Sequence, residues 1–397
     1  MKTVIEKDFD VDEYYKFGRK IYGPFLLAYS DWMYKKIVEK KTSSIFCLSR
    51  DGYMMKKGLE IIARREKSEI NIKYLYCSRK SLRQALLYTS KNYIESLKYL
   101  TFRKVVTVNI ILDYYGFNDK EIHEMSDRDG IRIDREIKYI DIENDKEIEE
   151  LYEKNKEKIL ERSQRQAHYL YEYLLKIGFS DKVAVADIGW HGSMQYYLEE
   201  FCNLHHIDVE ILGLYIGNHS FLPIRGELEG FLFRDSDLKK RQSVMCFFGV
   251  LEKLFQSHEG STLSYEMKGN EVIACLDEYE YVEDEEITKC IKMLQEGALE
   301  CMKNSCCTNI RKKDYKKLTG PLLHIGKYPT LANVNMFSFF YNIEGEEKAY
   351  FVAQKKLFEY TIAELKHSLC FSSWKTGFFK SLFKIPFPYY LIYKVVS

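Results

Sequence analysis

Two short clusters in this sequence place carboxylates, glycines and an arginine directly after apolar runs. In Ser49-Arg50-Asp51-Gly52-Tyr53 a permanent cation stands beside a carboxylate, and a glycine lets the backbone turn sharply. In Asp187-Ile188-Gly189-Trp190-His191-Gly192-Ser193 a carboxylate precedes two glycines and a helix start. Backbone N–H groups and the positive end of a helix macrodipole make such a turn an anion site. Both clusters therefore indicate phosphate binding beside a group that accepts a proton.

A structural interpretation competes with the functional one at each cluster. Arg50 and Asp51 would then only cap the following helix, and Asp187 would cap its own following helix. A histidine beside glycines is commonly an exposed or hydrogen-bonded residue, so we do not assign proton transfer to His191.

Two further clusters supply polar side chains of the same kinds. Ser78-Arg79 follows another apolar run and offers a second arginine for bidentate phosphate binding, although a lone arginine is usually an ordinary surface residue. Glu252 and the run Ser257-His258-Glu259-Gly260-Ser261-Thr262 follow an amphipathic stretch, and the end of that run has the composition of an anion-binding loop. An ordinary loop explains it equally well.

Apolar strands that alternate with helices must position these clusters. We predict strands at 43–48, 70–77, 182–186 and 209–216, and helices at 53–65, 80–88 and 193–204. This alternation predicts an α/β fold with a mostly parallel, Rossmann-like sheet and helices on both of its faces. Such sheets bind ligands outside the carboxyl ends of their strands, where Arg50, Arg79 and Asp187 fall.

Periodicity and composition divide the chain into five segments. Residues 1–96 hold the N-terminal helices, interrupted at Tyr22-Gly23-Pro24, and the first strand–helix units, and 180–265 hold the second part of the core. The charged stretch 97–179 is expected to be an inserted helical cap, and 266–373 a mixed region with a helix at 349–369. In 374–397 aromatic and aliphatic residues alternate with lysines and no acid appears, which suits either an anchor on an anionic membrane surface or a segment packed on the core.

Composition narrows the class of protein. Sixty basic and fifty-nine acidic residues among 397 give a net charge of +1, so we expect no nucleic acid partner. Met1–Asp8 lacks the apolar core of a signal peptide, and no apolar run reaches the ~20 residues that span a bilayer, so we expect a cytoplasmic protein. Of the ten cysteines, five stand singly in apolar or mixed segments as small hydrophobes, and Cys301, Cys306 and Cys307 lack the spacing of a zinc site.

A series of motifs across residues 14–265 resembles the glycan phosphoribosyltransferase domain, which follows a haloacid-dehalogenase-type phosphatase in many bacterial polysaccharide proteins. The motifs are Tyr22-Gly23-Pro24, Ser49-Arg50-Asp51-Gly52-Tyr53, Tyr76-Cys77-Ser78-Arg79, Asp187-Ile188-Gly189-Trp190-His191-Gly192-Ser193-Met194-Gln195, Gly213-Leu214-Tyr215-Ile216-Gly217 and Glu259-Gly260-Ser261-Thr262. The resemblance implies transfer of 5-phosphoribose from phosphoribosyl pyrophosphate to a glycan hydroxyl in surface polysaccharide biosynthesis. This chain departs from the pattern because it lacks the phosphatase half, so a separate phosphatase would have to remove the 5-phosphate. A lipid-linked glycan at the inner face of the cell membrane is the expected acceptor.

The residues and the resemblance lead to one hypothesis for the site. Asp51 or Asp187 accepts the proton of the attacking hydroxyl, and the other binds Mg²⁺ or stabilises positive charge on the ribose ring. The donor and its phosphates are assigned to Arg50, Gly52, Ser78, Arg79, Gly189, Trp190, His191, Gly192, Ser193 and Gln195. Supporting roles fall to Glu252, Glu259, Ser261 and Thr262. The alternatives are a glycosyltransferase that uses a nucleotide sugar on the same fold, and a non-catalytic scaffold that binds glycan or phosphate.

Overall fold

The computed structural model of the protein describes residues 10–305, 310–344 and 347–396. Met1–Asp8, Cys306 and Cys307, which carry two of the sequence-based expectations, lie outside the described residues. The cysteines within the described ranges are free thiols, and most of those predicted to be small hydrophobes are buried. None of the described helices is long and apolar enough to cross a membrane.

A five-stranded, all-parallel sheet forms the centre of the molecule and confirms the predicted α/β class. Its strands are β1 (Ser44–Leu48), β2 (Asn71–Leu75), β5 (Asp181–Trp190), β6 (Val209–Asn218) and β7 (Glu227–Phe233). Their order across the sheet is β2-β1-β5-β6-β7. The chain therefore builds outward in one direction from β1 and in the other from β5, and the order reverses between these two neighbours. In open α/β sheets this reversal point is where ligands bind.

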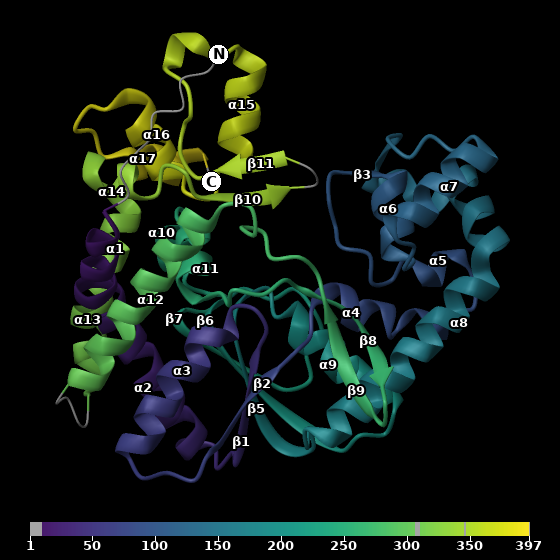
Figure 1. The fold of residues 1–397 in the computed structure, drawn as a ribbon, viewed down its shortest axis with the longest axis horizontal. Coiled ribbons are helices and arrows are strands. Elements are labelled where there is room, and N and C mark those ends of the chain that lie inside the picture. Colours follow the sequence, from purple (N-terminus) through teal and green to yellow (C-terminus); the bar gives the residue numbers. More distant parts are fainter. Residues whose placement is uncertain (1–9, 306–309, 345–346, 397) are drawn as a thin grey trace.

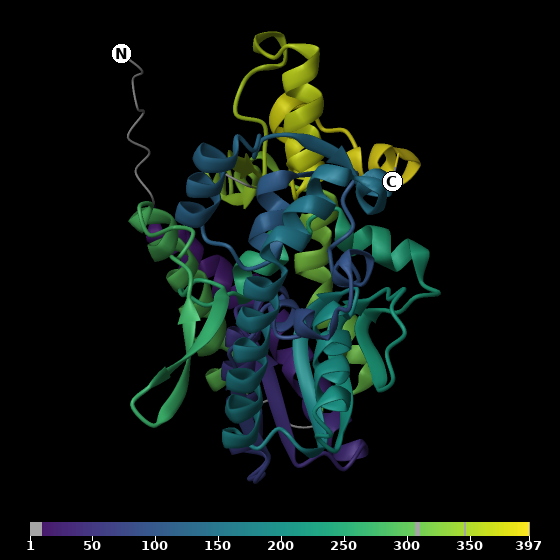
Figure 2. The same ribbon diagram turned by 90° about the vertical axis from the view of Figure 1, so that its right-hand side faces the viewer.

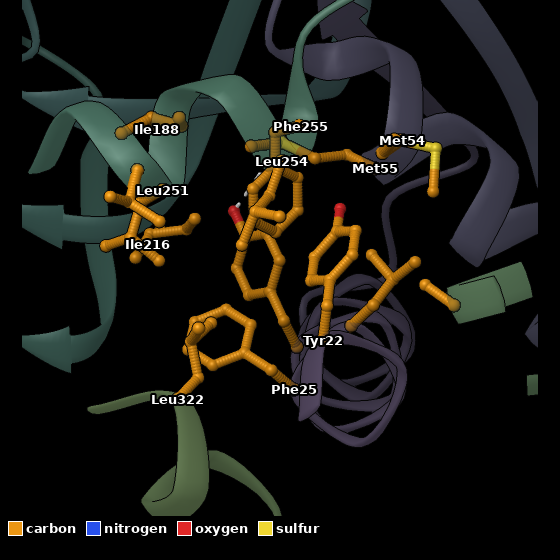
Figure 3. Close-up of a cluster of buried hydrophobic side chains, with 14 of the residues drawn as sticks. Tyr22, Phe25, Met54, Met55, Ile188, Ile216, Leu251, Leu254, Phe255 and Leu322 are labelled. Atoms are coloured by element: carbon orange, nitrogen blue, oxygen red, sulfur yellow. Dashed lines mark hydrogen bonds between the residues drawn. The ribbon is translucent and has the colours of Figure 1, made fainter. Parts of the chain in front are cut away.

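One face of the sheet is covered by helices from both ends of the sequence (Figure 1). These are α1 (Val11–Phe17), the π-helical turn η1 (Gly18–Tyr22), α2 (Gly23–Glu39), α3 (Gly52–Arg65), α11 (Phe248–Phe255), α12 (Glu285–Asn304) and α13 (Lys312–Lys327). Pro24 lies in the first turn of α2, where its missing N–H is harmless, as predicted. Figure 3 shows part of this core, in which the rings of Tyr22 and Phe25 pack edge-on against Phe255.

The other face packs against α4 (Arg79–Gln84), α8 (Lys146–Lys176) and α9 (Ser193–Leu204). The short elements η2 (Leu87–Thr89) and α5 (Tyr93–Ser96) precede the predicted insertion. The rest of the insertion is small and lies beyond the sheet: β3 (Val105–Thr107), α6 (Val108–Tyr114), α7 (Asp119–Asp129), β4 (Glu136–Lys138) and η3 (Tyr139–Asn144). The 31-residue helix α8 carries apolar residues along its whole length, and its second half covers the sheet. The predicted cap at 97–179 is thus partly a cap and partly a core layer.

The elements from α14 to α17 lie at the same end of the molecule as α5–α7 (Figures 1 and 2). They comprise α14 (Leu331–Met336), β10 (Tyr341–Glu344), β11 (Glu347–Tyr350), η4 (Leu357–Glu359), α15 (Ile362–Phe371), α16 (Lys375–Phe383) and α17 (Tyr389–Val396). Helix α10 (Leu238–Met245) packs against β7 and α13, and the hairpin of β8 (Thr262–Lys268) and β9 (Glu271–Leu276) lies beside α4 and α8. The prediction of a helix at 349–369 was wrong for the first half of that range. Thr361 caps α15 through the N–H of Glu364, so this helix starts only there.

Candidate functional site

Asp51 follows β1 at the reversal point, and its carboxylate is not used to cap a helix. It occupies the N-cap position of α3 but makes no side-chain capping bond. The adjacent Arg50 donates to Glu280 Oε1 across 3.3 Å and does not pair with Asp51. The purely structural interpretation of this cluster, a pair that caps the following helix, therefore does not describe it.

Asp187 lies on β5, the strand beside β1, and is also not a cap. The sequence predicted that this strand ends at Ala186, but β5 continues to Trp190, and Asp187 pairs with Tyr215 in the ladder to β6. The strand is longer because β6 continues to pair with it as far as Trp190, whereas its pairing with β1 ends at Ala186. Helix α9 has Gly192 at its N-cap, so the carboxylate of Asp187 has no capping role.

Three carboxyl groups at this edge of the sheet hold their protons unusually tightly. Burial raises the pKa of Asp51 to about 6. Burial and then the negative charge of Asp51 raise the pKa of Asp187 and of Glu252 to about 7 each. Because Asp51 raises the pKa of both partners, the three groups form one electrostatic unit. Carboxyl groups that titrate near neutrality are typical of general acids and bases.

Trp190 connects this unit to the edge of the sheet. Its indole N–H donates to Glu252 Oε1 across 3.0 Å, and its ring stacks on Phe233 with centroids 6.1 Å apart and an interplanar angle of 4°. The backbone of Trp190 has φ of 39°, a left-handed conformation that is strained for a bulky residue. The two side-chain contacts hold the strained residue in place, and they make Trp190 a support for Glu252.

Lys253 and Glu280 belong to the site but were missed in the sequence. Lys253 is 2% exposed, and its Nζ lies 2.7 Å from Glu280 Oε1, the atom that also accepts from Arg50. Burial lowers the pKa of Lys253, and the charge of Glu280 opposes this effect. Glu280 therefore binds both cations, and the charges of both cations lower the pKa of Asp51 and Glu252. The only signal in the sequence was the position of Lys253 directly after Glu252 on an amphipathic stretch.

Helix α4, which follows β2, carries two arginines, of which Arg79 acts on the carboxylate unit and Arg83 donates to the Arg79 carbonyl and to Thr101 Oγ1. Arg79 is exposed, and its positive charge lowers the pKa of both Asp51 and Asp187. Arg83, which the sequence analysis did not select, is one turn further along, and burial lowers the pKa of its guanidinium. Neither forms an ion pair with a carboxylate among the described residues. Ser78 has a structural role, since its hydroxyl accepts from Ser81 N–H at 3.0 Å and donates to the carbonyl of Thr262.

Two glycines with positive φ shape the end of β5 and the turn that follows it. Gly189 has φ of 100°, and a Cβ there would lie 2.3 Å from Tyr215 Cδ1. Gly192 has φ of 66° and starts α9, with Ser193 as the first helical residue. The carbonyl of Gly189 accepts from the N–H groups of His191 and Gly192, so these two groups are already used. An anion bound at this turn therefore meets the N–H groups of the first turn of α9.

Several predicted site residues have other functions in the structure. Gln195 is fully buried, and its amide already contacts Glu199 and Tyr215, so it cannot reach a ligand. Gly52 is needed because a Cβ would lie 2.5 Å from the backbone of Cys47. The exposed ring of His191 contacts the carbonyl of His219. Glu259 accepts a hydrogen bond from the Tyr76 hydroxyl, and the Ser261 carbonyl accepts one from the N–H of Asp277. Thr262 Oγ1 lies 3.4 Å from Ser49 Oγ. These contacts stabilise the loops around the site.

No family model matches this chain, and no curated protein matches its sequence. Among the described residues, no group of three or more histidine, cysteine or carboxylate side chains is arranged to hold a metal ion. Mg²⁺ is commonly bound by one or two carboxylates together with substrate phosphates, which is the donor set that Asp51 and Asp187 offer.

Proposed function

We propose that this protein is a glycan phosphoribosyltransferase, which transfers 5-phosphoribose from phosphoribosyl pyrophosphate to a glycan hydroxyl. One observation carries the proposal: Asp51 and Asp187 flank the reversal point of the sheet and form a unit with Glu252 whose pKa values lie near neutrality. Arg79 and the first turn of α9 lie around the same edge and supply phosphate ligands. The motif resemblance across 14–265 supports the choice of donor.

The proposed reaction exchanges one bond at the anomeric carbon of the ribose. The acceptor oxygen attacks this carbon as the bond to pyrophosphate breaks, and pyrophosphate leaves with the electron pair. The hydroxyl proton passes to Asp51 or Asp187, and in-line attack inverts the anomeric centre. The remaining carboxylates stabilise positive charge that develops on the ribose ring. Mg²⁺ bound by one aspartate would neutralise the departing pyrophosphate.

Incubation with phosphoribosyl pyrophosphate and candidate acceptor glycans tests the proposal. Mass spectrometry is expected to show a phosphoribosyl unit on the glycan, and phosphatase treatment should then convert it to a ribosyl unit. Turnover of a nucleotide sugar in place of this donor would identify the protein as another kind of glycosyltransferase. Binding of glycan without any transfer would identify a scaffold.

We predict that Arg79→Lys weakens binding of phosphoribosyl pyrophosphate by about tenfold, because an ammonium cannot replace a bidentate guanidinium on phosphate. Isothermal titration calorimetry measures the effect. Arg132→Lys serves as the control, since Arg132 is an exposed arginine of the insertion that is not part of the site. Equal affinities for the two variants would remove Arg79 from the donor site.

The pH dependence of transfer follows from the raised pKa values. A general base must be unprotonated, so activity should rise about tenfold per pH unit on the acid side and level off once the base is ionised. The pKa values of about 6 for Asp51 and about 7 for Asp187 place this rise between about pH 5 and 7, well above the range of an ordinary aspartate. Initial rates at saturating donor measure the profile, and a flat profile from pH 5 to 8 would contradict an aspartate base.

We also propose that the end of the chain attaches the protein to an anionic membrane surface. The boundary at Trp374 needs correction, because Trp374, Phe378 and Leu382 are buried and belong to the core. The exposed apolar side chains begin after them and are Phe383, Ile385, Phe387, Leu391, Ile392 and Val395. Lysines accompany these residues, and no acid occurs in 374–397. An apolar surface with lysines at its border suits an interfacial contact with anionic lipid.

We predict that Ile385→Ser combined with Phe387→Ser weakens co-sedimentation with anionic vesicles by about tenfold or more, since each side chain buries apolar surface in the interface. Ile140→Ser with Phe221→Ser is the matched control, because these side chains are 77% and 78% exposed elsewhere on the surface. Deletion from Trp374 is unsuitable as a test because it would remove buried residues. Equal loss in both double variants would show that the effect is not local.

A further inference from the structure

A groove with a volume of about 850 Å³ lies at the β7 edge of the sheet, on the face covered by α2 and α13. Residues of α2, β7, the start of α10 and α13 form its walls. Ligand sites in proteins typically have volumes of ~300–1,000 Å³. None of the residues assigned above to the carboxylate unit lines this groove, so it is a second site.

Three aromatic side chains from three different elements form the floor of the groove. The ring centroid of Phe231 lies 5.4 Å from that of Trp32 and 5.6 Å from that of Tyr315. The Tyr315 hydroxyl donates to Asp31 Oδ2 across 2.6 Å, which fixes the ring, and Lys35 Nζ lies over the ring at 5.7 Å from its centroid. Leu232 and Leu323 extend this apolar surface. The floor therefore suits a hydrocarbon group.

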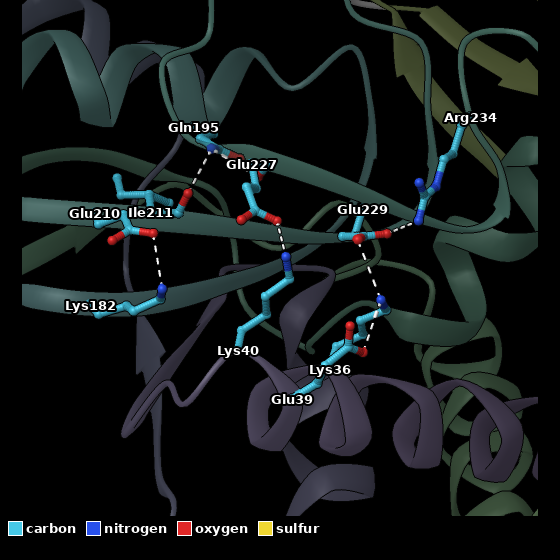
Figure 4. Close-up of polar contacts among 10 residues, drawn as sticks. All are labelled: Lys36, Glu39, Lys40, Lys182, Gln195, Glu210, Ile211, Glu227, Glu229 and Arg234. Atoms are coloured by element: carbon cyan, nitrogen blue, oxygen red, sulfur yellow. Dashed lines mark hydrogen bonds and ion pairs between the residues drawn. The ribbon is translucent and has the colours of Figure 1, made fainter.

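The walls above this floor are strongly basic. Six cationic side chains line the groove, namely Lys35, Lys36, Arg234, Lys240, Lys312 and Lys316, against the two acids Glu39 and Asp237. Lys36 and Arg234 share Glu229, and Lys36 also pairs with Glu39 (Figure 4). Lys35 pairs with Asp31, and Lys240 pairs with Asp237. Lys312 and Lys316 are exposed, lie one turn apart on α13, and form no ion pair with a described residue.

Two contacts connect the groove to the carboxylate unit and to the apolar surface near the C-terminus. Phe233 lines the groove and stacks on Trp190, which donates to Glu252 of the carboxylate unit. On the other side, the Tyr390 hydroxyl contacts the carbonyl of Lys239 across 3.5 Å, next to Lys240 of the groove wall. The groove thus lies between the proposed reaction centre and the apolar surface near the C-terminus.

We infer that the groove binds a diphosphate attached to an apolar chain, the carrier portion of a lipid-linked glycan acceptor. This assignment rests on the proposed function for the identity of the acceptor. The lysines of α13 contact the diphosphate, and the chain lies along Trp32, Phe231 and Tyr315 toward the C-terminal apolar surface. A bound carrier then presents the glycan toward Trp190 and the carboxylate unit. The largely apolar floor favours a hydrocarbon over a nucleoside, whose base and ribose need several hydrogen-bonding partners.

Farnesyl diphosphate is a water-soluble probe for this chemistry. We expect it to quench the fluorescence of the full-length protein, and Trp32→Phe to remove this signal while Trp190 and Trp374 remain. Pyrophosphate lacks the apolar chain, and farnesol lacks the diphosphate. Each should therefore bind at least about tenfold more weakly than farnesyl diphosphate. A uridine diphosphate that binds as tightly as farnesyl diphosphate would overturn the lipid assignment.

The two faces of α13 provide a matched pair of variants. Lys312→Ala with Lys316→Ala removes two cations from the groove, and Lys313→Ala with Lys317→Ala removes two exposed cations from the same helix outside it. The first variant should bind farnesyl diphosphate about tenfold more weakly and the second nearly as wild type, with equal thermal stability. Equal affinity of both variants would overturn the site.

The Asp187→Asn variant separates this inference from the proposed function, since it should bind the probe normally. Transfer to a soluble glycan by a protein that does not bind farnesyl diphosphate would overturn the groove assignment alone. Binding of the probe by a protein that transfers nothing from phosphoribosyl pyrophosphate would overturn the transferase proposal and leave the groove as a lipid diphosphate site.

Discussion

Asp187→Asn is expected to lower the rate of phosphoribosyl transfer by about 100-fold or more while the protein stays folded, because an amide accepts no proton at neutral pH. Asp51→Asn should have an effect of similar size. Asp181→Asn is the control variant, because Asp181 is exposed at the opposite end of the same strand, and its transfer rate should stay near that of the wild type. Near wild-type rates for both site variants would exclude the carboxylate unit as the reacting centre.

The same substitution should make the protein more stable, with an effect that depends on pH. The unfolded chain releases the proton of an aspartate near pH 4, whereas the folded chain holds that of Asp187 until about pH 7. Between these values unfolding releases a proton, so the free energy of unfolding falls as pH rises. Asparagine removes this penalty. Thermal unfolding should therefore show a gain of about 1 kcal/mol or more at pH 8 and little gain at pH 4.

A simultaneous loss of activity and gain of stability distinguishes a functional carboxylate from a structural one. A structural aspartate contributes to stability through its hydrogen bonds, so its removal lowers the free energy of unfolding. Asp51 and Asp187 have no capping role, and burial opposes the ionisation of both. Reduced stability of Asp187→Asn at pH 8 would point to a structural role.

The sequence was sufficient to predict the parallel sheet and the position of Asp51 and Asp187 at one edge of it. Short apolar runs followed by helical spacing are local signals, and each run ends in the cluster that the structure puts at the sheet edge. Strand β7 was missed because Glu227 and Glu229 interrupt its apolar residues. These acids are tolerated at an edge strand, where Lys40 and Lys36 of α2 pair with them.

Contacts between distant parts of the chain could not be predicted from local patterns. Arg50 and Glu280 are 230 positions apart, and nothing near Glu280 marks it as a partner. The segment near the C-terminus shows a similar division, because Trp374 is buried and Phe387 is exposed although both lie in one stretch of aromatic residues and lysines. Burial is decided by the tertiary structure, so local sequence patterns cannot separate the two residues.

Glu280→Gln tests the most consequential of these long-range contacts. The substitution leaves Arg50 and the almost fully buried Lys253 without their shared carboxylate, and a buried cation that loses its partner typically lowers stability by about 3 kcal/mol or more. Glu252 also attracts Lys253, so we expect a decrease of about 2–3 kcal/mol in urea denaturation. Glu278→Gln, an exposed neighbour, should change stability by less than about 0.5 kcal/mol.

A second substitution and a second measurement separate the charge effect from lost packing. Adding Lys253→Met to Glu280→Gln removes the buried cation, so the double variant should recover much of the stability that the single variant lost. The charge of Glu280 also raises the pKa of Asp51, so without it the rise of the pH–rate profile should move to lower pH. Failure of Lys253→Met to rescue stability, together with an unmoved profile, would show that Glu280 only fills space. Recovery of stability in the double variant would show that Glu280 permits two cations to be buried beside the carboxylate unit. A shift of the pH–rate profile to lower pH would show that Glu280 also limits how strongly these cations lower the pKa of Asp51.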